Sequence, residues 1–106
     1  MDLRTLKKYL KLSGAKLSHP YGKDISVYSI GDEMFALVEH TRTPIRISLR
    51  CDRQLAKILE ERYVEVMPGH KLNRNKWITV VLSGQLDNDE VRGLIYHSYD
   101  LASKED

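Results

Sequence analysis

The residues whose types and spacing suggest chemistry lie in one segment, Met67 to Ser83, which reads MPGHKLNRNKWITVVLS. Its loop follows a Pro-Gly turn, lacks aspartate and glutamate, and carries basic and amide side chains at His70, Lys71, Asn73, Arg74, Asn75 and Lys76. Lysine and arginine donate to phosphate oxygens, and asparagine can bond base edges or backbone. Trp77 follows the loop and can stack on an unpaired base if its ring is exposed. The segment is compatible with a nucleic-acid contact. The pattern has low specificity, because basic loops of this kind are common and a tryptophan is more often a core residue.

A second set of cations lies on the predicted strand over residues 45–51, where apolar and polar residues alternate strictly. Alternation places Arg46, Ser48 and Arg50 on one face of a sheet, the face open to water. If this strand neighbours the one after the loop, its arginines join the loop cations on one surface. The candidate nucleic-acid-binding residues are therefore Arg46, Arg50, Lys71, Asn73, Arg74, Lys76 and Trp77. The alternative is that the arginines simply keep a one-sided sheet soluble.

The sequence lacks the residue patterns of catalytic and metal sites. The four histidines are scattered without ligand spacing, and no glycine-rich phosphate loop follows a strand. Cys51 falls on the apolar phase of its strand, which predicts a buried, inert thiol. The adjacent carboxylates Glu60-Glu61 and Asp89-Glu90 fit solvated helix surfaces. We therefore predict a protein that is not an enzyme and that uses no cofactor and no metal.

Length and composition favour a single domain over residues 1–106, with 42% hydrophobic and 30% charged residues. No apolar run approaches the roughly 18 residues of a membrane span, and the lysine-rich start lacks the apolar stretch of a secretory signal. One cysteine excludes an internal disulfide. We expect a cytoplasmic protein that does not enter a membrane. Its positive charge gathers in residues 1–23 and in the loop, and its negative charge from Asp87 onward, which predicts a positive side and a negative end.

Three helices are expected from apolar spacing and capping residues. Asp2 begins a first helix that buries Leu3, Leu6 and Leu10 and stops at Gly14. Asp52 begins a second, with a buried stripe predicted at Leu55, Ile58, Leu59 and Tyr63. Asp87 and Glu90 form a capping-box start for a third, with a buried face predicted at Val91, Leu94, Ile95, Ser98 and Leu101. Gly93 inside the third helix suggests a close contact between helix and sheet.

Strands are expected between these helices. Residues 25–30 and 34–38 read as a hairpin joined by Gly31-Asp32, followed by the alternating strand. Residues 64–67 and 76–82 follow the second helix. The latter run is apolar on both faces, so it is either central or exposes an aromatic patch. The predicted order is helix, three strands, helix, two strands, helix, which makes an α+β two-layer sandwich on a mainly antiparallel sheet.

Three stretches together resemble the MmcQ/YjbR family: IRISLRCD at 45–52, MPGHKLNRNKWITV at 67–80 and HSYDL at 97–101. The resemblance covers nearly the whole chain. Its most specific parts are Pro68-Gly69, Leu72-Asn73 and Trp77 in that spacing, with Ser98-Tyr99 in the last helix.

One departure from the family pattern concerns a histidine. Members often place it directly before the Leu/Met-Asn pair, whereas here His70 stands one position earlier and Lys71 takes its place. No role is therefore assigned to His70.

The resemblance implies a fold likened to the bacterial frataxin relative CyaY and to type III secretion chaperones. It also implies DNA binding of a double-wing type, which we expect to be weak and without sequence preference, and it brings no catalytic residues. A frataxin-like iron site depends on an acidic ridge at the first helix. That helix is basic here, with only Asp2 at its start, so iron binding is not expected.

A protein-interaction module or chaperone-like homodimer is the alternative to nucleic acid. In that case Trp77 with Ile78 or Val81 supplies an apolar anchor. The exposed side of the last strand separates the two hypotheses. Arginine and lysine around an open groove favour nucleic acid, and a contiguous apolar patch favours a partner protein.

Overall fold

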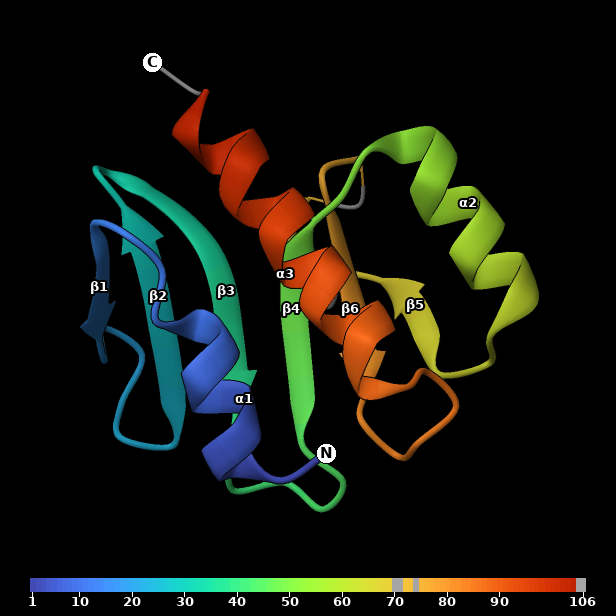
Figure 1. Ribbon diagram of the computed structural model, residues 1–106, viewed down its shortest axis with the longest axis horizontal. Helices are drawn as coiled ribbons and strands as arrows, with labels where there is room; N and C mark the ends of the chain where they lie inside the picture. The colour runs from blue at the N-terminus through green and yellow to red at the C-terminus, as the bar shows by residue number, and fades with distance from the viewer. Residues whose placement is uncertain (70–71, 74, 105–106) are drawn as a thin grey trace.

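The computed structural model describes residues 1–69, 72–73 and 75–104 (Figure 1). His70 and two of the predicted nucleic-acid-binding residues, Lys71 and Arg74, lie outside these residues. The elements in chain order are α1 (Leu3–Leu10), β1 (Ala15–Ser18), β2 (Ile25–Ile30), β3 (Glu33–Glu39), β4 (Arg46–Arg50), α2 (Arg53–Arg62), β5 (Val66–Pro68), β6 (Trp77–Val81) and α3 (Asn88–Ser103).

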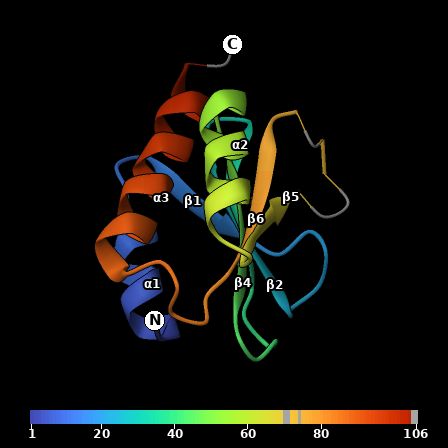
Figure 2. The ribbon, with the colours of Figure 1, turned by 90° about the vertical axis from the view of Figure 1, so that its right-hand side faces the viewer.

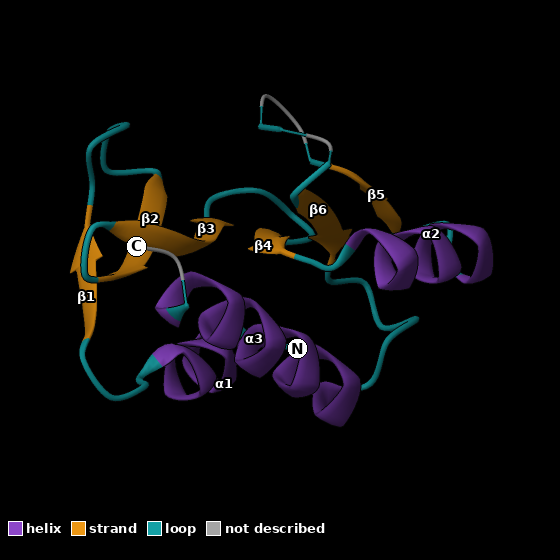
Figure 3. Cartoon of the chain, turned by 90° about the horizontal axis from the view of Figure 1, so that it is seen from above, coloured by secondary structure: helices purple, strands orange, loops and turns teal. Residues whose placement is uncertain are grey.

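The strands form one six-stranded antiparallel sheet in the order β1-β2-β3-β4-β6-β5. The three helices lie on one side of it, as the views along the sheet show (Figures 2 and 3). The predicted α+β two-layer sandwich is therefore confirmed. Because the helices cover only one face, the opposite face is left to the loops between strands.

The predicted order is wrong by one strand, because it lacks β1. This strand, AKLS, pairs with β2 from Ala15 opposite Ile30 to Ser18 opposite Val27. Its four residues alternate apolar and polar, but the run is short and its last three residues are exposed, so backbone pairing at the sheet edge defines it. Four residues are at the lower limit of a pattern that predicts a strand from the sequence.

The hairpin around Gly31 and the alternating strand are confirmed as β2, β3 and β4. The prediction that Ser48 of β4 is open to water is wrong, because Ser48 is buried and its hydroxyl bonds that of Thr79 on β6. Gly31 has a φ of 59°, the left-handed conformation that a tight hairpin turn requires. Between Tyr28 and Ser29 the register with β3 shifts, so β3 carries one extra residue, Phe35. This bulge lets Phe35 join the core, where its ring packs edge-on against Tyr99 of α3 with centroids 5.5 Å apart.

Strand β6 lies between β4 and β5, so it is central, which settles the alternative left by its two apolar faces. All of its residues from Trp77 to Val80 are buried. The largest fully buried side chains lie between the sheet and the helices: Leu6, Leu10, Phe35, Ile47, Leu49, Ile78 and Ile95.

The predicted helix starts are confirmed at all three helices. Asp2 accepts from the Thr5 amide, Asp52 from two amides of α2, and Asp87 forms the full capping box with Glu90. These caps satisfy amides that have no partner within the helix.

Two side chains of the predicted helical stripes lie elsewhere than expected. Ile58 of α2 is 54% exposed, whereas Ala56 and Leu59 are the buried residues of that helix. In α3 the last buried residue is Ala102, with Leu101 only half-buried. Helix α2 packs against the edge strand β5 and so buries a narrower stripe than a helix over the sheet centre.

The prediction for Gly93 is wrong. Gly93 is exposed, and a Cβ placed on it meets nothing within 4 Å, so no close contact between helix and sheet explains it. The close approach occurs instead at Gly69, where a Cβ would lie 2.7 Å from Cβ of Trp77.

Three consecutive residues of α3 hold the helix to the sheet. The Ser98 hydroxyl accepts from the Arg50 amide at 2.8 Å and donates to the Phe35 carbonyl at 2.5 Å, bridging β4 and β3 beyond their last paired residues. His97 Nε2 accepts from the Asp52 amide, and the Tyr99 hydroxyl donates to the Ser13 carbonyl. The stretch His97-Ser98-Tyr99, which resembles the family pattern, therefore bonds the last helix to three other segments of the chain.

Candidate functional site

The sheet face away from the helices carries three of the seven predicted nucleic-acid-binding residues, Arg46, Arg50 and Trp77. Ladder partners share a face, so Arg50 of β4 lies beside Trp77 of β6, and Arg46 lies beside Val81. The structure thus places the predicted strand with Arg46 and Arg50 beside the strand that follows the basic loop. What each side chain does there differs from residue to residue.

Arg50 is held by the fold. Its Nε donates to the Met34 carbonyl at 2.6 Å and its Nη2 to the Glu33 carboxylate at 2.8 Å. The guanidinium also lies 5.2 Å from the centre of the Trp77 ring, a cation–π contact. Because its acceptors lie on β3 and its side chain is 12% exposed, Arg50 holds the ends of β3 and β4 together. It is poorly placed to receive a phosphate.

Trp77 is 6% exposed, beneath Arg50. The condition for base stacking, an exposed ring, is therefore not met in this structure. The same burial removes Trp77 as an apolar anchor for a partner protein. Its role in the described residues is to fix the end of the loop to the sheet.

The loop before Trp77 is shaped by Asn73. The Asn73 carbonyl accepts from the amides of Lys76 and Trp77, each at 3.0 Å, and its side-chain oxygen accepts from the Asn75 amide at 2.9 Å. Gly69 closes the loop at its other end by donating to the Trp77 carbonyl. These contacts give the Pro-Gly, Asn and Trp spacing a structural meaning, and they occupy the Asn73 oxygen that was predicted to contact nucleic acid.

A cationic hollow of about 220 Å³ lies beside this loop, at the junction of β4 and α2. Its lining includes the cations Arg50, Arg53 and Lys76, with Asn75 and one carboxylate, Asp52, which accepts from the first amides of α2. Arg53 Nη1 donates to the Asn75 side-chain oxygen, which ties α2 to the loop, and both Arg53 and Lys76 are exposed. Arg53 is a cation that the sequence analysis missed. Its position directly after the N-cap, where the alternating strand ends, is the signal that points to it.

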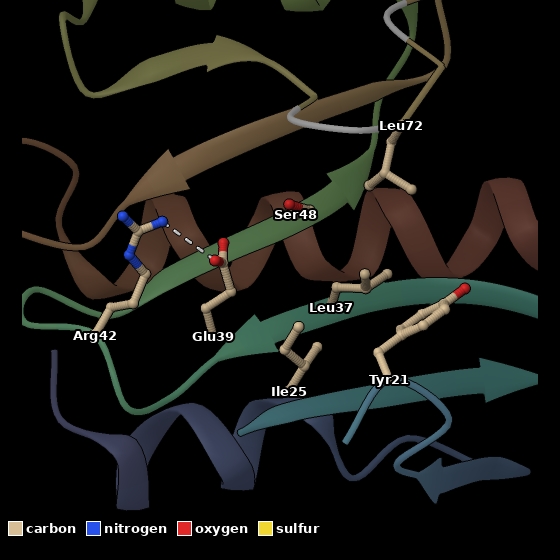
Figure 4. A pocket seen from close by; sticks show the side chains of 7 residues that line it. All are labelled: Tyr21, Ile25, Leu37, Glu39, Arg42, Ser48 and Leu72. Carbon is tan, nitrogen blue, oxygen red and sulfur yellow. Dashed lines mark hydrogen bonds and ion pairs between the residues drawn. The ribbon is translucent and has the colours of Figure 1, made fainter. Parts of the chain in front are cut away.

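A larger groove of about 470 Å³ lies on the helix-free face, on the other side of the same loop. Figure 4 shows Tyr21 and Leu72 at one end of it, on two loops, with Leu37 near them, Ile25 and Ser48 nearer to Glu39, and α3 behind the sheet. Tyr21 is 57% exposed. The sequence analysis did not select these residues, although an aromatic side chain between Pro20 and Gly22 and a single apolar residue in a polar loop were available signals.

One end of this groove is polar. Glu39 and Arg42 form an ion pair at 3.2 Å there (Figure 4). Arg46 is the ladder partner of Glu39 and shares its face. Among the described residues Arg46 forms no ion pair, so this end of the groove carries two cations and one carboxylate.

Cys51 is 4% exposed, and burial, helped by the negative charges of Asp52 and Glu60, raises the pKa of its thiol to about 11. This agrees with the predicted buried thiol, since the thiolate is the nucleophilic form. Within the described part of the chain no three histidine, cysteine or carboxylate side chains gather as metal ligands. No helix there is long and apolar enough to cross a membrane.

The family described as YjbR matches this chain over residues 10–101. The chain belongs to the YjbR family. Among relatives of this YjbR-family domain, YbdF of Escherichia coli O157:H7 is 29% identical over 92 residues, covering 87% of this chain and 75% of YbdF. YjbR of Escherichia coli K12 is 32% identical over 73 residues, which are 69% of this chain and 62% of YjbR. The predicted resemblance is thereby confirmed.

Two crystal structures share the fold of this YjbR-family domain. Protein DR2400 of Deinococcus radiodurans, a DUF419 domain, superposes with a TM-score of 0.93 at 26% identity, over 98% of this chain and 80% of DR2400. A Pseudomonas syringae protein superposes with a TM-score of 0.80 at 26% identity, over 96% of this chain and 99% of that one.

Proposed function

We propose that this domain is a non-enzymatic, cytoplasmic nucleic-acid-binding module that contacts DNA phosphates through the cations around the hollow beside the loop. The observation that supports this is the convergence of Arg53 and Lys76, both exposed, on one hollow. Lys71 and Arg74 stand in the same loop sequence and add to its positive charge. The proposal needs no cofactor.

Phosphate contacts of this kind give weak binding without sequence preference. Lysine and arginine neutralise phosphate charge, and the released counterions supply the affinity. Sequence is read by base edges in the grooves of DNA. The hollow offers Asn75, but its side-chain oxygen already accepts from Arg53. The hollow therefore orients a backbone and selects no base.

The test is the anisotropy of a labelled duplex titrated with the protein at about 50 and 200 mM salt, over which phosphate-driven binding weakens steeply. We expect Lys76→Ala and Arg53→Ala each to lower the affinity and to reduce the slope of log K against log salt by about 1. Lys16→Ala is the matched control, because Lys16 is exposed on β1, at the opposite edge of the sheet from β5.

If Lys76→Ala, Arg53→Ala and Lys16→Ala lower the affinity for DNA equally, binding depends on the total charge of the protein and not on the hollow. No saturable binding of duplex or single strand at the lower salt would remove the nucleic-acid proposal altogether.

A protein partner or a homodimer is the second candidate, and strand β1 favours it. Its edge is unpaired by any described strand, and Leu17 on it is 52% exposed. Open edge strands are templates for pairing with another chain. Sedimentation equilibrium tests this candidate: a dimer that Leu17→Asp abolishes supports it, and a monomer throughout the concentration range counts against it.

A further inference from the structure

The groove on the helix-free face has the form of a base-binding site. We propose that it holds one unpaired base of a single-stranded nucleic acid, so that the domain prefers single strand to duplex. This inference rests on the proposed function and adds the class of nucleic acid to it.

The walls of the groove suit a flat, aromatic ligand. Tyr21 offers an exposed ring on one side and Leu72 an apolar side chain on the other, from loops that face each other across β2, β3 and β4 (Figure 4). Ile25 and Leu37 form an apolar floor. A base between an aromatic ring and an aliphatic side chain keeps both of its faces covered, as stacking requires.

The polar end of the groove matches the edge of a base. The Glu39 carboxylate accepts hydrogen bonds and the Arg42 guanidinium donates them, and the two lie 3.2 Å apart. The edges of bases present donors and acceptors side by side, and arginine and carboxylate are common partners for them. The ion pair can therefore exchange part of its mutual contact for a base without leaving a charge unpaired.

Charge around the groove favours a nucleotide over a neutral apolar peptide. Arg42 and Arg46 outnumber Glu39 at the polar end, and beyond Leu72 the loop leads to Lys76 and the cationic hollow. A strand that places a base in the groove can thus set phosphates against cations at both ends. An apolar peptide would use the walls and leave these cations without a ligand.

A paired base cannot enter this groove. Within a duplex both faces of a base are stacked and its edge is paired, so only an unpaired or extruded base can lie between two side chains. Phosphates of a duplex can still reach the cationic hollow. The two surfaces therefore predict different responses of single strand and duplex to the same substitution.

The experiment compares binding of a labelled single-stranded oligonucleotide and of its duplex by anisotropy. We expect the single strand to bind more tightly, and Tyr21→Ala to weaken it about 5- to 150-fold while leaving the duplex unchanged. Tyr21→Phe keeps the ring and should retain the affinity. Leu72→Ala should weaken the single strand as well. Ile58→Ala is the control, because Ile58 on α2 is a large hydrophobic residue about as exposed as Tyr21.

The outcomes separate the two proposals. If the duplex binds as tightly as the single strand and Tyr21→Ala changes neither, while Lys76→Ala weakens both, the phosphate surface stands and the base site is refuted. If neither nucleic acid binds, the proposed function fails. Methyl spectra of Ile25, Leu37 and Leu72 during the titration locate the ligand independently, and shifts confined to other methyl groups would also overturn the base site.

Discussion

The hydroxyl of Ser98 replaces a backbone hydrogen bond that β3 and β4 do not form with each other at Phe35 and Arg50. The bulge at Phe35 carries the Phe35 carbonyl and the Arg50 amide out of direct reach, and Ser98 Oγ bonds both. Ser98 is fully buried, so no water can substitute for it at the surface. Arg50, a predicted phosphate ligand, has the matching task on the outer face through Glu33 and Met34.

Ser98→Ala should lower the free energy of unfolding by about 1–3 kcal/mol, because the buried Phe35 carbonyl and the Arg50 amide both lose their hydrogen bond to the Ser98 hydroxyl. Urea unfolding followed by the fluorescence of buried Trp77 measures this loss. Ser103→Ala is the matched control in the same helix: its hydroxyl bonds the Tyr99 carbonyl at an exposed position, and its loss should change stability by less than about 0.5 kcal/mol. Similar values for the two variants would show that the bridge contributes little.

At the scale of the element, helices and strands with a periodic residue pattern could be predicted from the sequence. Contacts between residues on different strands could not. Strand β4 and the capping box at Asp87 follow from local residue types, and both are confirmed. Strand β1 alternates over four residues only, buries none of them fully, and exists by pairing with β2. The groove could not be predicted, because Tyr21 and Leu72 meet only through the strand order.

Two glycines show the same difference between what the sequence indicates and what tertiary contacts decide. A close contact was expected at Gly93, yet the close approach is at Gly69 of the Pro-Gly turn, with Trp77. A glycine with no neighbour within reach costs a helix stability without any packing benefit.

Gly93→Ala should therefore raise the free energy of unfolding by about 0.5–1 kcal/mol, through better helix propensity and a less flexible unfolded chain. Thermal unfolding followed by circular dichroism measures the change. Gly69→Ala is the opposite case, because its Cβ would press on the Trp77 backbone, and it should lower the melting temperature. A Gly93→Ala protein that melts earlier than the parent would point to a contact at this position that the structure does not contain.

At the scale of the whole molecule, two ligand surfaces lie on either side of one loop. Asn73 and Gly69 fix that loop, Leu72 faces the groove, and Lys76 faces the hollow. The loop reaches the hydrophobic core through Trp77, whose neighbour in the ladder is Arg50. Cys51 follows Arg50 and lines the hollow from beneath. The reactivity of this buried thiol therefore measures how often the fold opens around the hollow.

The Cys51 thiol should react with a disulfide reagent at pH 8 only as fast as the molecule opens. Burial raises its pKa from 9.0 to about 11, so the thiolate is scarce in the native state, and urea should make labelling rapid.

Because the Cys51 thiol of the unfolded chain loses its proton at lower pH than that of the folded one, stability should fall as the pH rises from about 9 to about 11. Burial also raises the pKa of Tyr28, which acts in the same direction. The hydrogen bond to Glu90 raises the pKa of Tyr63 as well. Cys51→Ala should lose only the share of the thiol, so urea midpoints at pH 8 and 10 should lie closer together than in the parent. Identical separations in the two proteins would show that the thiol does not couple to folding.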